Sequence, residues 1–238
     1  MNIIKEKGHM GHKMNESNYT KLLFLAEEKY KNINIESHDW QHILRVLNYC
    51  KKINKKENVN NKILFPACIL HDLGRENGKE SIHSESITVA KNLLIRANYD
   101  QDLITKILAC IKSHSVDSKN KPVSLEAKIL FDADKLDSYG AIGVSRFFMM
   151  ANEQNWSLQK SADKAFERIT KLNEINGFYT KEAESIGLSK AKKTFVYYYS
   201  LFKELGDTKK VKFLESILTN KYGKLKGKLF LAILKTLY

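Results

Sequence analysis

An adjacent imidazole and carboxylate end an apolar run in this 238-residue chain. His71 and Asp72 follow the apolar residues 67–70, and Gly74 comes shortly after them. A buried imidazole and a buried carboxylate are costly to desolvate unless a partner compensates them. A divalent cation is the simplest such partner, because neutral His and ionised Asp are both metal ligands. The pair therefore predicts a metal site, provided that other segments supply further ligands.

Two other segments carry ligand residues of the same kind. His42 lies beside the apolar stripe of a predicted helix, and Asp134 lies in the Asp-rich segment 132–137 at the end of another. Two nitrogen and two carboxylate ligands suit a divalent transition metal, with water in the open positions. Each histidine alone would be an ordinary core or surface residue. Their recurrence on apolar faces favours one shared site.

The elements that must position these residues are all predicted to be helices. The chain has only two prolines and eleven glycines, and its apolar residues recur at helical spacing. Residues 1–15 are expected to form a flexible leader, and residues 16–238 a single helical domain with a core at about 37–150 and an extension at about 151–238. Helices are expected near 18–31, 37–55, 60–70, 83–97, 100–111, 124–137, 157–175, 180–205 and 208–221.

The charge balance favours a phosphate-bearing partner. The chain has 40 basic and 27 acidic residues, a formal net charge of +13, and such a surface attracts nucleotides and other polyanions. A solvated, Lys-rich surface explains the same balance equally well. No helix-turn-helix or zinc-finger spacing is present, so we do not expect a nucleic-acid partner.

The cysteines and the apolar runs bear on the compartment. Three cysteines without paired spacing argue against a disulfide framework. The N-terminus lacks a signal peptide, and no run approaches the roughly 18 apolar residues of a membrane span. We therefore expect a cytoplasmic protein without a transmembrane segment. The apolar tail 228–235 is expected to pack against the body, with a homodimer contact or membrane-surface attachment as alternatives.

The spacing of these motifs resembles that of a known family. The segments His42-x-x-Arg45, His71-Asp72-x-Gly74 and 132–137 are similar to the HD superfamily of metal-dependent phosphohydrolases. The amino-acid sequence of residues 125–143 is closer still to that of a bacterial subgroup of stand-alone HD hydrolases. The resemblance covers about 37–148 and continues more weakly through 179–183. It implies an all-α fold, an HD-domain helical bundle with additional C-terminal helices.

The resemblance also implies roles for the acidic residues and the first histidines. The metal ligands implied by the family pattern are His42, His71, Asp72 and Asp134. Asp132 and Asp137 then become helix-end residues or hydrogen-bond partners of the ligands. Asp39, three residues before His42, is expected to accept the hydrogen bond from the ring of that histidine.

Further residues are implied in catalysis and substrate binding. His83 is expected to protonate the leaving group or to hold phosphate, alongside Asp72 as a catalytic ligand. His114 and His83 match positions that bind a second metal or phosphate in some members, so the metal count stays open at one or two. The candidate phosphate contacts are Arg45, Arg75, Lys79 and Lys135.

The resulting hypothesis is a metal-dependent phosphohydrolase that acts on a nucleotide or a similar small phosphorylated molecule. The resembling subgroup includes nucleoside triphosphate pyrophosphohydrolases. The expected cofactor is a divalent metal ion, with Mn²⁺ first and Mg²⁺, Co²⁺, Ni²⁺ or Fe²⁺ as alternatives. Two other functions remain open: a two-metal phosphodiesterase acting on a cyclic nucleotide or nucleic acid, and a non-catalytic module that binds metal and nucleotide.

Overall fold

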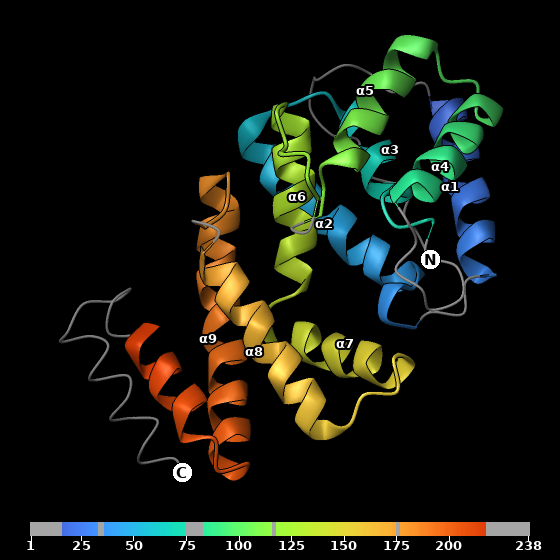
Figure 1. The fold of residues 1–238 in the computed structure, drawn as a ribbon. Helices are drawn as coiled ribbons and strands as arrows, with labels where there is room; N and C mark the ends of the chain where they lie inside the picture. The colour runs from blue at the N-terminus through green and yellow to red at the C-terminus, as the bar shows by residue number, and fades with distance from the viewer. Residues whose placement is uncertain (1–15, 33–35, 75–82, 116–117, 175–176, 218–238) are drawn as a thin grey trace. The chain divides into compact units, whose positions relative to one another are not determined.

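The regular structure of this protein is helical, as the sequence predicts. The computed structural model describes residues 16–32, 36–74, 83–115, 118–174 and 177–217, and no strand occurs within these ranges (Figure 1). The described residues form two compact units. The first comprises residues up to 137 together with 179–183, and the second comprises 138–178 and the residues from 184 onward. The expected leader 1–15 lies outside the described residues.

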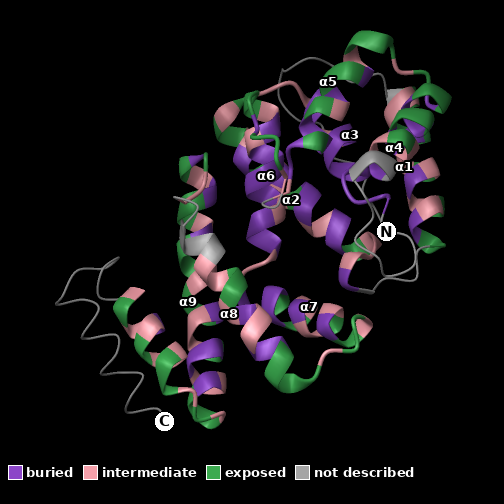
Figure 2. Cartoon of the chain, viewed as in Figure 1, coloured by how far each residue is buried: buried purple, intermediate pink, exposed green. Residues whose placement is uncertain are grey.

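The first unit is built around helix α3. Its elements are α1 (Glu16–Lys31), a 3₁₀ turn (Glu36–His38), α2 (Trp40–Glu57), α3 (Asn61–Leu70), α4 (His83–Arg96), α5 (Gln101–Lys112) and α6 (Leu125–Asp137). α3 contacts α1, α2, α5 and α6, and α2 packs most extensively on α6. Residues 66–74 are buried without exception, so the segment that leads into His71 and Asp72 lies in the core (Figure 2).

Capping side chains set the starts of several helices. Asp100 accepts a hydrogen bond from the backbone N–H of Leu103, which begins α5 as the sequence predicts. The start of α2 differs from the expectation near residue 37. Ser37 lies in the 3₁₀ turn, and Asp39 caps α2 because its carboxylate accepts from the backbone N–H of His42 at 2.8 Å.

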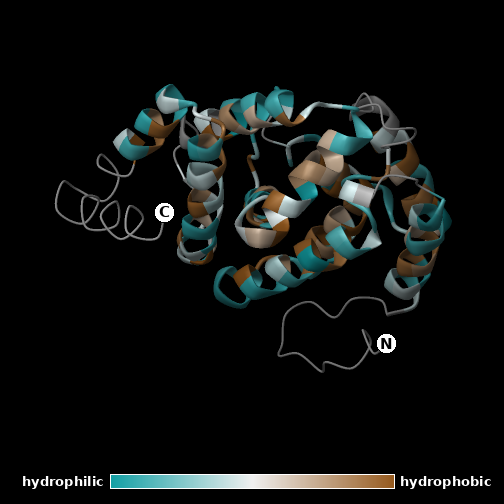
Figure 3. Cartoon of the chain, turned by 90° about the horizontal axis from the view of Figure 1, so that it is seen from below, coloured by the Kyte–Doolittle hydropathy of each residue, from teal (hydrophilic) through white to brown (hydrophobic). Residues whose placement is uncertain are grey.

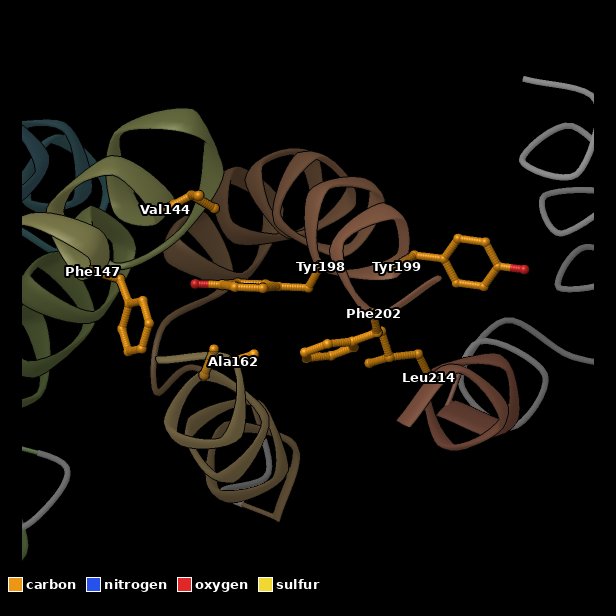
Figure 4. Close-up of a cluster of buried hydrophobic side chains, with 8 residues drawn as sticks. Val144, Phe147, Ala162, Tyr198, Tyr199, Phe202 and Leu214 are labelled. Carbon is orange, nitrogen blue, oxygen red and sulfur yellow. The ribbon is translucent and has the colours of Figure 1, made fainter. Parts of the chain in front are cut away.

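The second unit has its own aromatic core. It contains α7 (Gly140–Glu153), α8 (Leu158–Glu174), most of α9 (Lys181–Glu204) and the helical residues 208–217. The buried cluster consists of Val144, Phe147, Ala162, Ala165, Tyr198, Tyr199, Phe202 and Leu214 (Figure 4). The rings of Tyr198 and Phe202 are stacked, with centroids 6.1 Å apart. α7 therefore belongs with the C-terminal helices, whereas the sequence placed residues up to about 150 with the HD core.

The helices carry hydrophilic and hydrophobic residues along their lengths (Figure 3). None of the described helices is both long and apolar enough to cross a membrane. The apolar tail 228–235 lies outside the described residues, so its expected packing or dimer contact stays a prediction.

Gly74 allows the turn after the His-Asp pair to lie directly against α4. A Cβ added at Gly74 would overlap the backbone nitrogen and Cα of Ser86. Because Ser86 is part of α4, relief would require the helix backbone to move.

We therefore expect Gly74→Ala to lower the free energy of unfolding by about 1–3 kcal/mol, the usual cost of overpacking. Urea unfolding followed by circular dichroism measures this change. The overlap is with backbone as well as with the Ser86 hydroxyl, so the double variant Gly74→Ala/Ser86→Ala should remain destabilised. Full recovery in the double variant would contradict the backbone explanation.

Candidate metal centre

Three separate helical segments bring the predicted ligands together. His42 lies in the first turn of α2, His71 and Asp72 follow the last residue of α3, and Asp134 lies in α6. Ligand atoms of His42, His71 and Asp134 all lie within 4.8 Å of one another. The close packing of α2 on α6, with α3 against both, produces this convergence (Figure 1).

One carboxylate oxygen of each aspartate lies within 3.8 Å of the Nε2 atoms of both histidines. Asp72 Oδ2 lies 3.3 Å from His42 Nε2 and 3.4 Å from His71 Nε2. Asp134 Oδ1 lies 3.5 Å and 3.8 Å from the same two nitrogens. Four potential ligand atoms from four side chains therefore face a common point.

The histidine nitrogens show that this arrangement fits a metal ion. His42 and His71 are fully buried, and neither Nε2 atom has a hydrogen-bond partner among the described residues. Buried polar atoms without partners are rare and costly. A divalent cation bound by both nitrogens and by the two carboxylates would satisfy all four groups at once.

The other nitrogen of each ring fixes the orientation needed for metal binding. His71 Nδ1 lies 2.7 Å from the carbonyl oxygen of Cys68. A carbonyl only accepts, so Nδ1 donates its hydrogen and Nε2 carries the lone pair. His42 Nδ1 lies 2.9 Å from Asp137 Oδ2, and by the same reasoning its Nε2 faces the site as a ligand.

The site's electrostatics favour cation binding. Burial would raise the pKa of Asp134, but the nearby rings of His71 and His42, 3.8 Å and 3.5 Å from its Oδ1, hold the pKa well below its usual value. For His71, burial lowers the pKa, but the carboxylates of Asp72 and Asp134 raise it by more. The net shift of the His71 pKa is therefore upward. The His71 ring therefore keeps a second proton up to a higher pH than a free imidazole does.

His114 forms a second group with the His-Asp pair. Its Nε2 lies 3.6 Å from Asp72 Oδ1, and its ring centroid lies 4.9 Å from that of His71. Its Nδ1 lies 2.6 Å from the carbonyl oxygen of Ile111, which directs Nε2 toward Asp72. The two oxygens of Asp72 thus face different partners, one toward His42 and His71 and one toward His114.

Asp137 and Arg45 have roles that differ from the sequence-based expectation. The sequence suggested Asp39 as acceptor for the His42 ring, but the structure places Asp137 there, while Asp39 caps α2. Arg45, expected to contact phosphate, places Nε 3.0 Å from Asp137 Oδ1 and Nη2 3.1 Å from Asp137 Oδ2. A usable signal for Asp137 was its spacing of three residues from Asp134, which puts both on neighbouring positions of one helix face.

Asp132 makes its hydrogen bonds away from the ligand cluster. Its carboxylate accepts from the backbone N–H groups of Tyr179 and Thr180 at 2.9 Å and 2.8 Å and from the Thr180 hydroxyl at 2.8 Å. It therefore holds 179–183 against α6. This contact is not a link to the metal ligands.

Of the remaining candidates for substrate contact, the structure describes the side chain of Lys135 alone. Lys135 is buried, with Nζ 5.8 Å from the centroid of the Phe131 ring. Arg75 and Lys79 lie outside the described residues. His83 is the first residue of α4, and its side chain is likewise outside what the structure describes.

Comparison with known proteins points to one family. The model of the HD domain matches residues 39–139, a range that contains all four candidate ligands. The uncharacterised protein YpgQ of Bacillus subtilis strain 168 is 28% identical over 146 residues, which cover 58% of this chain and 71% of YpgQ.

Solved structures share the fold. The crystal structure of Bacillus subtilis YpgQ in complex with ADP has a TM-score of 0.62 at 22% identity and covers 78% of this chain and 96% of that chain. A structure from Lactobacillus plantarum has a TM-score of 0.69 at 20% identity, covering 82% of this chain and 100% of its own. An HD-superfamily hydrolase from Bacillus thuringiensis has a TM-score of 0.61 at 21% identity, covering 81% and 99%. At these identities the likeness establishes a shared fold.

We expect a divalent metal to stabilise the protein through these ligands. Mn²⁺ at 100 times its Kd should raise the free energy of unfolding by about 2.7 kcal/mol, and a chelator should reverse the effect. Thermal denaturation of the metal-free and Mn²⁺-loaded protein measures the shift in Tm. In His71→Ala the shift should disappear. An equal shift in His71→Ala would place the bound metal elsewhere.

Metal affinity should also depend on pH in a defined direction. Because the pKa of His71 is raised, its ring stays protonated to a higher pH than a free histidine, and a metal must displace that proton. The apparent affinity should therefore increase as the pH rises through this pKa, by about tenfold per pH unit below it for one displaced proton. Competition titrations with a chelator from about pH 6 to about pH 8 measure the slope. A flat profile across this range would contradict the assignment.

Proposed function

We propose that this chain, in which residues 39–139 match the HD domain, is a metal-dependent phosphohydrolase. Its substrate would be a nucleotide or a similar small phosphorylated molecule, cleaved at a phosphate ester or anhydride bond. The observation that carries this proposal is the pair of buried Nε2 atoms of His42 and His71, which face two carboxylates and have no hydrogen-bond partner in the described part of the chain.

The chain's own residues would bind the ion and keep it in place. His42, His71, Asp72 and Asp134 would hold a divalent ion, with Mn²⁺ as the first candidate. Such an ion, when bound, lowers the pKa of water and offsets charge on a phosphoryl oxygen. The lowered pKa of Asp134 keeps this carboxylate ionised at neutral pH, ready to act as a ligand.

Asp72 and two further histidines are the candidates for proton transfer and phosphate binding. Asp72 combines its role as a ligand with a contact to His114 at 3.6 Å, so it connects the ligand cluster to a second imidazole. His114 would bind a second ion or a phosphate oxygen from that position. His83, at the start of α4, would donate a proton to the departing oxygen.

Two observations support a nucleotide as substrate. YpgQ, which shares the fold, has been crystallised with ADP. The formal net charge of +13 favours the approach of a polyanionic molecule. A nucleoside triphosphate pyrophosphohydrolase, which releases pyrophosphate, is the specific activity that we propose within this class.

A two-metal phosphodiesterase is the second candidate, and the His71, Asp72 and His114 group favours it. One oxygen of Asp72 lies 3.4 Å from His71 Nε2 and the other 3.6 Å from His114 Nε2, so Asp72 and His114 would help to hold a second ion. Elemental analysis of the loaded protein separates the candidates. Two ions per chain in the native protein and one in His114→Ala would favour the phosphodiesterase.

The proposed hydrolysis can be tested by a substrate screen with Asp72→Ala as the inactive variant. Nucleoside mono-, di- and triphosphates, cyclic nucleotides and sugar phosphates are incubated with each candidate metal, and orthophosphate and pyrophosphate are measured separately. We expect metal-dependent release from a nucleotide and a loss of at least about 100-fold in Asp72→Ala, because losing a ligand should cost more than the roughly 10- to 100-fold typical of losing a hydrogen-bond partner of a ligand. Asp102→Ala is the matched control, because that aspartate lies on the exposed face of α5, where its carboxylate contacts the Lys106 ammonium.

Full activity in a folded Asp72→Ala protein would refute the mechanism. Metal-dependent nucleotide binding without any product would instead support a non-catalytic binding module.

A further inference from the structure

The rings of His42, His71 and His114 are oriented by two kinds of hydrogen-bond acceptor. His71 and His114 lie at the ends of α3 and α5, and each places Nδ1 against the carbonyl oxygen three residues earlier, in the last turn of its helix. Carbonyls in the last turn of a helix have no partner within that helix, so they are available to a side chain. His42 has no such carbonyl, because it is the third residue of α2.

The first turn of a helix presents N–H groups, and its carbonyls accept from residues further along. The ring of His42 therefore needs an acceptor from another element. Asp137, the last residue of α6 and fully buried, supplies it with Oδ2 at 2.9 Å from His42 Nδ1. Among the described residues, His42 is therefore the one of these three histidines whose Nδ1 hydrogen bond goes to a side chain, which mutation can change.

Arg45 completes the arrangement from the same helix as His42. It lies three residues later in α2, and its Nε and Nη2 contact both oxygens of Asp137. A buried carboxylate is costly without a compensating charge, and the planar guanidinium matches its two oxygens. Only 29% of the Arg45 side chain is exposed, so the pair is largely withdrawn from solvent.

We infer that Arg45 and Asp137 are positioning residues for the metal centre: together they hold His42 in the tautomer that leaves Nε2 free to bind the ion. This inference rests on the metal site of the proposed function and deepens it. It moves Arg45 from phosphate binding to orientation of a ligand. Asparagine at position 137 can donate its amide N–H to Nδ1, which places the ring hydrogen on Nε2, where it blocks metal binding.

The direct test is the tautomer of His42 in metal-free protein. Correlation spectra of ¹⁵N-labelled histidine rings distinguish a protonated Nδ1 from a protonated Nε2, and a His42→Gln spectrum identifies the His42 signals. In the native protein we expect the hydrogen on Nδ1. In Asp137→Asn we expect a shift of the population toward hydrogen on Nε2, together with a 10- to 100-fold weaker Mn²⁺ affinity.

Two further variants make the result specific. Asp132→Asn is the matched control, because Asp132 is a fully buried aspartate of the same helix whose hydrogen bonds go to Tyr179 and Thr180. It should leave both the His42 tautomer and the Mn²⁺ affinity unchanged. Arg45→Gln should weaken Mn²⁺ binding by a smaller factor than Asp137→Asn, and Arg45→Lys should recover part of the loss. These Arg45 variants carry the test if Asp137→Asn does not fold.

An unchanged tautomer and Mn²⁺ affinity in folded Asp137→Asn or Arg45→Gln would overturn the inference. The same holds if Arg45→Gln weakens only the binding of ADP, because Arg45 would then contact phosphate. Neither the spectra nor the metal titrations depend on turnover. Failure to find a hydrolysed substrate would therefore count against the proposed function alone.

Discussion

The first unit must offset the desolvation cost of a cluster of polar and charged side chains inside its apolar interior. A polar cluster lies where α2, α3 and α6 meet. It consists of the buried side chains of His42, His71 and Asp72, with the partly buried carboxylate of Asp134 beside them. The helices that supply the ligands also form the core around them, so packing and chemistry share the same residues. A cation at this point would convert mutual repulsion between the carboxylates into attraction toward a common charge. The Arg45 guanidinium likewise compensates the buried carboxylate of Asp137, which lies next to the cluster.

Much of the fold could be predicted because local signals determine it. Helical spacing of apolar residues and the scarcity of proline and glycine indicate an all-α chain, and capping residues such as Asp100 mark helix starts. The start of α2 was misplaced because Ser37 and Asp39 are both good capping residues. Only the three-dimensional path shows that the chain forms a 3₁₀ turn before Asp39 caps the helix. The grouping of α7 with the C-terminal helices likewise depends on packing between distant segments.

The candidate ligands His42, His71 and Asp72 were predictable because each interrupts an apolar face, and the family pattern selected Asp134 among the aspartates of 132–137. Their hydrogen-bond partners were not. His71 and His114 use backbone carbonyls, which no residue type reveals. His42 uses Asp137, a residue 95 positions away, and Arg45 approaches the same carboxylate from α2. A charged residue near a metal site suggests substrate binding from sequence alone, whereas its actual partner depends on how α2 lies against α6.

Because Asp132 binds residues 179–180, the first unit can complete its contacts only after the ribosome has translated a segment from later in the chain. The first unit includes 179–183, so part of it is translated only after α7 and α8. Until Thr180 leaves the ribosome, the Asp132 carboxylate lacks the three donors that satisfy it in the folded chain. A nascent chain that ends before this point must keep that carboxylate hydrated, which opposes burial of the adjoining face of α6. Completion of the ligand-bearing unit is thereby tied to emergence of a segment from the second half of the chain.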